Sequence, residues 1–208
     1  MRRVQYSRAE LGREREGVSL LELCIVVAVM LVVAATAIPS LMTAVQHYRL
    51  RVAANNLAAM LQTARMHCVR DNRHYAVQEL NTTQGSFTYT QLFLDQNGNG
   101  TYDSGEDMVL LPGGVRFNAG AAPALSAATL GYTPQPASTA LSFNAMGLPC
   151  VVRNGICTNW DAAGNAVGVV YFLQDTRASS SWAAVSVSPA GRARTWQWTA
   201  GSSQWVVQ

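Results

Sequence analysis

The strongest pattern along the chain is an uninterrupted apolar run that follows a charged stretch. Residues 23–46 contain no charged side chain, and the run LCIVVAVMLVVAATAI ends just before Pro39. About 20 apolar residues are needed for one helical crossing of a bilayer, so this run predicts a membrane-spanning helix. Five arginines lie in residues 1–16 and would hold that end in the cytoplasm by the positive-inside tendency. The body of the protein is therefore expected on the other side of the membrane.

Helical spacing continues after the apolar run. Pro39 is expected to kink or loosen the helix, because it lacks an N–H and its ring crowds the preceding turn. Beyond it, small and apolar residues recur at intervals of three and four, which predicts one buried stripe on a helix that leaves the membrane. The members of this stripe are Leu50, Ala54, Leu57, Leu61, Ala64 and Cys68.

The rest of the chain has the pattern of short strands separated by glycine, proline and asparagine. Strands are expected within residues 74–80, 85–95, 106–118, 141–145, 168–175 and 183–189. Residues 118–140, rich in alanine, proline, serine and threonine, are expected to form a long loop with little strand character. The expected fold class is α+β, with a long N-terminal helix packed on an antiparallel β-sheet.

Bulk composition limits the functions to consider. A chain of 208 residues with 49% hydrophobic and 13% charged positions can bury one core besides a membrane segment. The formal charge is +3, but much of it lies before residue 17, so net charge indicates no partner. After the apolar run there is no nucleophile with a base, no glycine-rich phosphate loop and no spaced carboxylate pair, so an enzyme is not expected.

Glu22 is an unusual residue at the start of an apolar helix, because an unpaired carboxylate in hydrocarbon is unfavourable. A cleavable secretory signal is one interpretation, with small residues near Ala34–Ala37 as its cleavage site. A second is cleavage after Gly17 on the cytoplasmic side, which leaves the apolar segment as the new N-terminus. Glu22 then becomes the fifth mature residue.

This segment, REREG followed by VSLLELCIVVAVMLVVAATAIPS, resembles the class III signal of type IV pilins and type II secretion pseudopilins. The resemblance rests on Gly17 before the cut, Glu22 five residues after it and Pro39 near mature position twenty-two. Val18 stands where the family usually has phenylalanine. The resemblance implies that a membrane prepilin peptidase cleaves after Gly17 and N-methylates Val18.

The resemblance also implies a role for Glu22 in assembly. In a growing filament its carboxylate would neutralise the α-ammonium group of Val18 on a neighbouring subunit. The alternative is that Glu22 lies at headgroup level near the helix end, within reach of water.

A sequence pattern typical of calcium loops lies between two predicted strands. The run DQNGNGTYDSGE fits D-x-[DN]-x-[DN]-G-x5-E, with Gly100 at the turn. Its candidate ligands are Asp95, Asn97, Asn99, Thr101, Asp103 and Glu106. Flanking strands rather than helices, and the tendency of Asp, Asn and Gly to form turns, favour a plain hairpin connection. No other cofactor is expected.

The four cysteines fall into two groups. Cys150 and Cys157 flank an Arg-Asn-Gly turn, and in an exported domain they are expected to form a disulfide. Cys24 and Cys68 lie on apolar helix positions and are expected to act as small hydrophobic residues.

Near the C-terminus, Gly191, Arg192 and Arg194 precede a tryptophan-rich tail. In an extended segment the two guanidinium groups would point the same way and could bind successive phosphates. Trp196 and Trp198 could then offer faces for stacking bases. The alternative is an ordinary solvated hairpin.

Several motifs together resemble the FimT and GspH group of minor pilins and pseudopilins: the long helix, NGNGTYD, LSFNAMGLP and VSVSPAGRARTW. In FimT-type minor pilins a C-terminal Gly-Arg-x-Arg is associated with DNA binding during natural transformation. The resemblance therefore implies a filament subunit, with double-stranded DNA as a candidate partner. The alternative is a purely structural pseudopilin of a type II secretion system.

The same resemblance implies the division of the chain. Residues 1–17 would be the leader, 18–39 the transmembrane or filament-core helix, 40–75 its continuation and 76–208 the pilin head domain. The protein would cross the bacterial inner membrane once, with a cytoplasmic N-terminus and a periplasmic head, and would enter a pilus or pseudopilus with other pilins.

Overall fold

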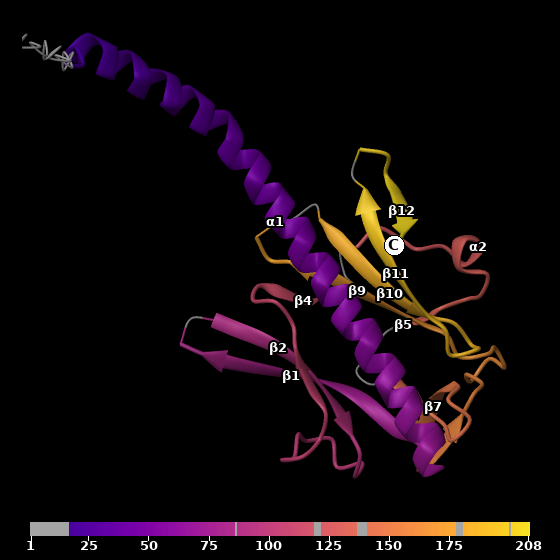
Figure 1. Ribbon diagram of the computed structural model, residues 1–208. Helices are drawn as coiled ribbons and strands as arrows, with labels where there is room; N and C mark the ends of the chain where they lie inside the picture. The colour runs from indigo at the N-terminus through magenta and orange to yellow at the C-terminus, as the bar shows by residue number, and fades with distance from the viewer. Residues whose placement is uncertain (1–16, 86, 119–121, 137–140, 178–180, 200) are drawn as a thin grey trace, which may run out of the picture. The chain divides into compact units, whose positions relative to one another are not determined.

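The computed structural model describes residues 17–208 except 86, 119–121, 137–140, 178–180 and 200. The chain divides into two compact units, Met1–Met42 and Thr43–Gln208. One helix, α1, Leu20–Asp71, contributes to both units. Residues 20–42 of the helix follow residues 17–19 in the described portion of the first unit, and residues 43–71 belong to the second (Figure 1).

The second unit contains two β-sheets and a short helix besides α1. The strands are β1 Tyr75–Gln84, β2 Phe87–Asp95, β3 Met108–Leu110, β4 Val115–Phe117, β5 Gln135–Pro136, β6 Leu141–Phe143, β7 Pro149–Arg153, β8 Ile156–Thr158, β9 Val169–Asp175, β10 Trp182–Val187, β11 Ala193–Thr199 and β12 Gln204–Val207, and α2 is Ala127–Leu130. The first sheet has the order β3-β2-β1-β6-β7-β8. The second has the order β12-β11-β10-β9-β4, with β5 added in parallel to β9. All other pairs are antiparallel, so the predicted α+β class is confirmed, with two sheets where one was expected.

The main core lies between the second half of α1 and both sheets. Every member of the predicted stripe is buried, namely Leu50, Ala54, Leu57, Leu61, Ala64 and Cys68. These residues pack in one cluster with apolar side chains of the first sheet, such as Val77 and Leu92, and of the second, such as Leu173 and Val185. The helical stripe therefore joins the two sheets, because burying it requires apolar surface from each.

A smaller cluster covers the other face of the second sheet. Leu125 and Leu130 pack there against residues of β9, β10, β11 and β12, including Trp196 and Trp205. Residues 118–140 are thus more than a loop: they contain α2, which Ser126 caps at its N-terminus and Gly131 ends at φ 81°, and they contain β5. Because both faces of the sheet are covered, every residue of β10 is buried.

Two strand predictions need correction. The predicted strand at 106–118 is two strands in different sheets, because Leu111 bonds to β2 while Pro112 and Gly114 turn the chain toward β9. Strands β7, β8, β11 and β12 were not predicted as such. They include the arginine-bearing strand, β11.

Candidate functional site: the apolar helix and the arginine turn

The N-terminal part of α1 carries the predicted maturation and assembly residues. Gly17 and Val18 precede the helix and are exposed, and the Ser19 carbonyl accepts the first helical bond from the Leu23 N–H at 3.1 Å. Glu22 lies in the first turn, where a carboxylate interacts favourably with the helix dipole. Residues 1–16 of the expected leader lie outside the described residues.

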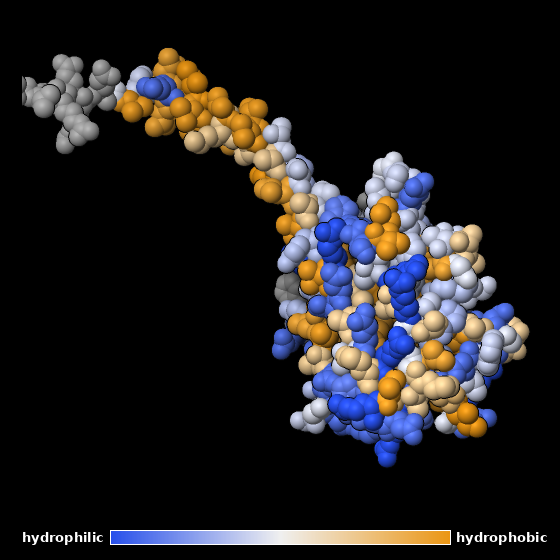
Figure 2. Space-filling model, turned by 45° about the vertical axis from the view of Figure 1, so that its right-hand side comes forward, coloured by the Kyte–Doolittle hydropathy of each residue, from blue (hydrophilic) through white to orange (hydrophobic). Residues whose placement is uncertain are grey.

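Apart from Glu22, the face of this part of α1 seen in Figure 2 is largely apolar, and most of its large side chains are exposed hydrophobic ones. The described residues contain one helix long and apolar enough to cross a membrane, and its most apolar window is not buried within the protein. A helix without a polar face requires lipid or other apolar helices around it. Pro39, where a kink or loosening was predicted, lies inside α1. The helix continues on both sides of it.

The arginine turn, residues 188–192, joins β10 to β11. The Gly191 N–H donates to the Ser188 carbonyl at 2.7 Å, and the Ser188 N–H donates to the Arg192 carbonyl at 3.0 Å. A third bond runs from the Arg192 N–H to Ser188 Oγ at 3.2 Å. Gly191 has φ 76°, a left-handed conformation that favours glycine. The sequence Ser-Pro-Ala-Gly-Arg therefore forms a tight, well-bonded hairpin.

Both arginines of the Gly-Arg-x-Arg motif are exposed. Arg194 lies in β11 opposite Ser186, and Arg192 is the last residue before the strand. Side chains alternate along β11: Gln197 bonds to His47 of α1 at 2.9 Å, while Trp196 enters the cluster on the other face of the sheet. Arg194 shares the face of Trp196, away from α1.

The tryptophans are not placed as the sequence suggested. Trp196 is only 4% exposed, and its Nε1 donates to Ser186 Oγ at 2.8 Å. Trp198 is half-buried, and its ring centroid lies 5.5 Å from that of Trp205. The prediction that Trp196 stacks on a base is wrong, because the ring is already buried in a cluster with Leu125 and Leu130.

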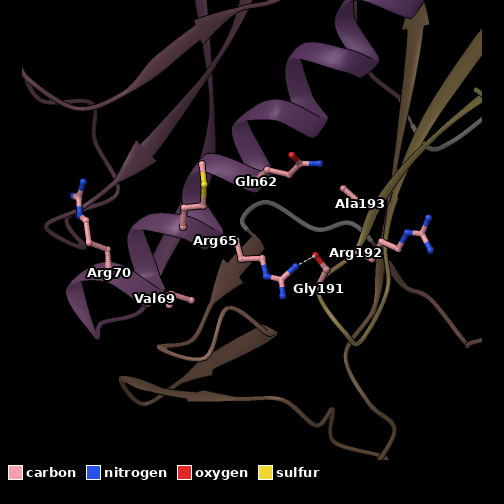
Figure 3. A pocket seen from close by; sticks show the side chains of 8 residues that line it. Gln62, Arg65, Val69, Arg70, Gly191, Arg192 and Ala193 are labelled. Carbon is pink, nitrogen blue, oxygen red and sulfur yellow. Dashed lines mark hydrogen bonds between the residues drawn. The ribbon is translucent and has the colours of Figure 1, made fainter.

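A groove of about 560 Å³ lies between α1 and the arginine turn (Figure 3). Its lining residues are Gln62, Arg65, Met66, Val69, Arg70, Gly191, Arg192 and Ala193. Arg65 Nη1 donates to the Gly191 carbonyl at 3.2 Å, and in Figure 3 the Arg192 side chain extends away from Arg65. The helix therefore contacts the arginine turn within this groove through the side chain of Arg65.

The predicted calcium loop forms a hairpin connection whose carboxylates accept hydrogen bonds from the loop. Both oxygens of Asp95 accept backbone N–H groups, from Gly98 at 2.7 Å and Gly100 at 2.9 Å. Glu106 accepts from the Gln96 and Asp103 N–H groups. The other candidate ligands, Asn97, Asn99, Thr101 and Asp103, bond to one another. Within the described part of the chain, no three His, Cys, Asp or Glu side chains are grouped as a metal site.

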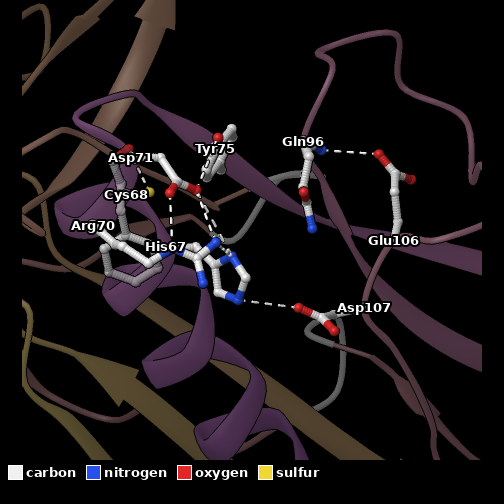
Figure 4. Close-up of polar contacts among 9 residues, drawn as sticks. His67, Cys68, Arg70, Asp71, Tyr75, Gln96, Glu106 and Asp107 are labelled. Atoms are coloured by element: carbon white, nitrogen blue, oxygen red, sulfur yellow. Dashed lines mark hydrogen bonds and ion pairs between the residues drawn. The ribbon is translucent and has the colours of Figure 1, made fainter.

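The end of this loop is tied to the helix by a polar network (Figure 4). His67 Nε2 lies 3.2 Å from Asp107 Oδ2. Arg70 pairs with Asp71 at 2.8 Å, and this hydrogen bond is the main cause of the lowered pKa of Asp71. The pair of His67 and Asp107 thus connects the end of the loop to the last turns of α1.

The cysteines occupy three environments. Cys150 and Cys157 are joined by a disulfide across the β7–β8 hairpin, with Cα atoms 5.4 Å apart. Cys68 is fully buried and donates to the Phe143 carbonyl at 3.3 Å, and burial raises its pKa. Cys24 is exposed on the apolar part of α1.

The sequence of this chain matches a known protein family. The sequence model of the family described as type II transport protein GspH matches residues 53–191, which is more than half of the chain. The chain belongs to the GspH family. The predicted resemblance to minor pilins and pseudopilins is thereby confirmed.

Two individual proteins resemble this GspH-family chain. The pilin-like protein PilA1 of Thermus thermophilus is 37% identical over 93 residues, which are 45% of this chain and 56% of that protein. The chain thus spans a little over half the length of that relative. The type IV minor pilin FimU of Pseudomonas aeruginosa aligns with 18% identity and a TM-score of 0.42, over 69% of this chain and 85% of that one.

The boundaries of the GspH match matter for the candidate sites. The match includes the Asp95–Glu106 loop, both disulfide cysteines and Gly191, and it ends one residue before Arg192. Glu22 lies outside it as well. Membership in the family therefore carries no argument for the two arginines, which must be judged from their geometry.

Two polar side chains, the half-buried Arg65 and the buried Asp175, were not predicted to have special surroundings. Arg65 contacts a turn 126 residues away, and no local pattern marks it. Asp175 ends β9 and is fully buried; its Oδ1 accepts from the Arg177 N–H at 3.0 Å, while its Oδ2 makes no hydrogen bond within the described residues. Burial raises the pKa of Asp175, and the Arg49 charge partly opposes this.

Proposed function

We propose that the protein is a minor pilin of a type IV filament and enters the polymer through the apolar part of α1. The observation that carries this proposal is that no residue in the most apolar window of α1 is buried within the protein, while the first turn of the same helix carries a carboxylate, Glu22. A carboxylate at depth in a bilayer costs about 2.5 kcal/mol or more when it lacks a partner. Membership in the GspH family and similarity to a protein named pilin-like support the same function.

The partner of Glu22 would be the α-ammonium group of Val18, released when prepilin peptidase removes residues 1–17. The backbone at Gly17 and Val18 is exposed and precedes the helix, so a peptidase can reach that bond without unwinding α1. Before assembly the chain would cross the inner membrane once, with its N-terminus in the cytoplasm and the head domain in the periplasm. The filament's other pilins would then supply apolar surface around the helix.

Mass spectrometry of protein from the native host tests maturation. The expected N-terminal peptide starts at N-methylated Val18, and deletion of the prepilin peptidase should restore the Gly17–Val18 bond. A Gly17→Phe variant should also retain the leader, because a bulky side chain would replace the smallest residue at the bond that the peptidase cleaves. Protein that carries an intact leader within filaments would contradict the proposal.

The head domain would in addition bind double-stranded DNA through Arg192 and Arg194. Both guanidinium groups are exposed, and they are two residues apart beside a rigid hairpin, a spacing that suits successive phosphates. The buried Trp196 offers no stacking, so binding would rest on phosphate contacts and would not discriminate among sequences. Such binding fits capture of DNA for natural transformation.

The second candidate function is that of a GspH-type pseudopilin with a purely structural role in type II secretion. The family match favours it, because the matching family is described as a type II transport protein. A binding titration with duplex DNA separates the two functions. The DNA proposal expects affinity to fall steeply with salt, with a slope of about −0.9 per phosphate contact, and to be lost when Arg192 and Arg194 become alanine.

Arg153→Ala is the matched control for that titration, because Arg153 is an exposed arginine in a different strand, β7. It should bind DNA as the native protein does. No binding by the native protein at low salt would leave the structural role as the better account.

A further inference from the structure

Two glycines from separate turns lie against each other beside α1. Gly147 belongs to the turn between β6 and β7, and Gly191 to the arginine turn; their φ values are 71° and 76°. A Cβ atom on Gly191 would lie 2.5 Å from the Gly147 carbonyl oxygen, which is closer than such atoms approach. Each glycine is therefore required by its left-handed backbone and also by lack of space.

The side chain of Arg65 lies across both glycines. A Cβ atom on Gly147 would be 2.8 Å from Arg65 Cγ, and one on Gly191 would be 3.3 Å from Arg65 Cζ. Arg65 Nη1 also donates to the Gly191 carbonyl, and the arginine is half-buried. Helix α1 thus fixes the two turns through one side chain.

We infer that Arg65 is a positioning residue that sets where the arginine turn presents Arg192. This inference rests on the proposed DNA binding, since it assigns a role to Arg65 at that same site. The guanidinium group is engaged with the Gly191 carbonyl, and in Figure 3 the Arg192 side chain extends in another direction. Arg65 therefore acts on DNA affinity through the turn and not by its own charge.

The two DNA-contacting arginines should depend on Arg65 unequally. Arg192 follows Gly191 directly and lies outside the strand, so its position follows that of the turn. Arg194 is held by the β10–β11 ladder opposite Ser186, whether or not Arg65 is present. Loss of Arg65 should therefore remove the contribution of Arg192 and leave that of Arg194.

A double-mutant cycle on the full-length protein in a neutral detergent tests this. The probe is a fluorescein-labelled DNA duplex of about 20 base pairs, two turns of the double helix, at low salt. Arg65→Met keeps an unbranched side chain over the glycines but removes the hydrogen bond and the charge. We expect Arg65→Met and Arg192→Ala each to weaken binding on the order of tenfold, with no further loss when they are combined. Arg65→Met combined with Arg194→Ala should be additive.

Arg70→Met is the control, because Arg70 lines the same groove but pairs with Asp71. It should bind DNA as the native protein does. Additive losses for Arg65→Met with Arg192→Ala would mean that Arg65 touches phosphate itself, and native affinity in Arg65→Met would mean that it has no role. Either result overturns the inference without affecting the proposed function.

Hydrogen exchange gives a readout that does not need DNA. The peptide containing the Gly191 N–H should exchange roughly fivefold faster in Arg65→Met than in the native protein. If the native protein binds no DNA, the proposed DNA binding fails and the DNA role of Arg65 fails with it. Unchanged exchange would refute the positioning of the turn in either case.

Discussion

Substitution of Gly191 by alanine is expected to be among the most damaging single changes in the head domain. The new Cβ atom would lie 2.5 Å from the Gly147 carbonyl oxygen, where ordinary contacts begin at 3.4 Å. That oxygen belongs to the backbone of another turn, so one of the two turns must move. The alanine must also adopt φ near 76°, which the L configuration disfavours.

The loss in the free energy of unfolding that Gly191→Ala causes is the sum of these two effects. The left-handed backbone costs alanine about 1 kcal/mol, and relieving the overlap against backbone costs about 2 kcal/mol more. A loss of about 3 kcal/mol in the free energy of unfolding lowers Tm by about 6 to 12 °C for a domain of this size. Near-UV circular dichroism during heating measures this, because the buried Trp196 reports on the packing of the second sheet.

Gly131→Ala is the matched control. Gly131 has φ 81° at the end of α2, and an added Cβ atom there would meet nothing within 4 Å. The Gly131→Ala variant should lose only the free energy that the left-handed backbone costs alanine, about 1 kcal/mol. This loss lowers Tm by about 2 to 4 °C. Equal losses for Gly131→Ala and Gly191→Ala would refute the close approach of the two turns.

The remaining predictions concern other parts of the head domain. Burial raises the pKa of Asp175, so the folded state holds its proton longer than the unfolded chain, and stability falls as pH rises from 3.8 through the folded-state pKa. Asp175→Asn should therefore raise Tm at pH values near neutrality, and the gain should vanish as the pH approaches 3.8. Replacing Cys150 and Cys157 by serine should cost about 2 kcal/mol, because the disulfide closes a short loop; chemical denaturation of the oxidised and reduced native protein supplies the comparison. Millimolar calcium should leave Tm unchanged, since the loop at 95–106 already satisfies its carboxylates internally; a calcium-dependent rise would contradict this.

The helical part of the fold could be predicted because its burial follows the period of the helix. Leu50, Leu57 and Leu61 recur at helical spacing, and all three are buried. Strand β11 was not predicted, although its residues alternate between the two faces of the sheet, because Trp196 and Trp198 were interpreted as part of a C-terminal tail. Strand β10 carries no alternation of burial, since both faces of its sheet are covered.

The division into two sheets and the surroundings of the candidate site depend on contacts distant in sequence. The turn at residues 112–114 reads like any hairpin turn, and nothing local indicates that it leads into another sheet. The pleat places Trp196 on the face of Arg194, but only the packing of Leu125 shows that this face is covered. Arg65 meets Gly191 across 126 positions, a contact with no local sequence signal.

Assembly into the filament is expected to depend most on the carboxylate of Glu22, in the first turn of α1. Glu22→Gln keeps the size and hydrogen-bonding capacity of the side chain and removes its charge. The most direct measurement is the amount of the Glu22→Gln protein in sheared filaments, relative to native protein expressed at the same membrane level. We predict that the variant is cleaved after Gly17, stays in the membrane and is largely missing from filaments. Native amounts of the variant in filaments would contradict the pairing of Glu22 with the Val18 amine.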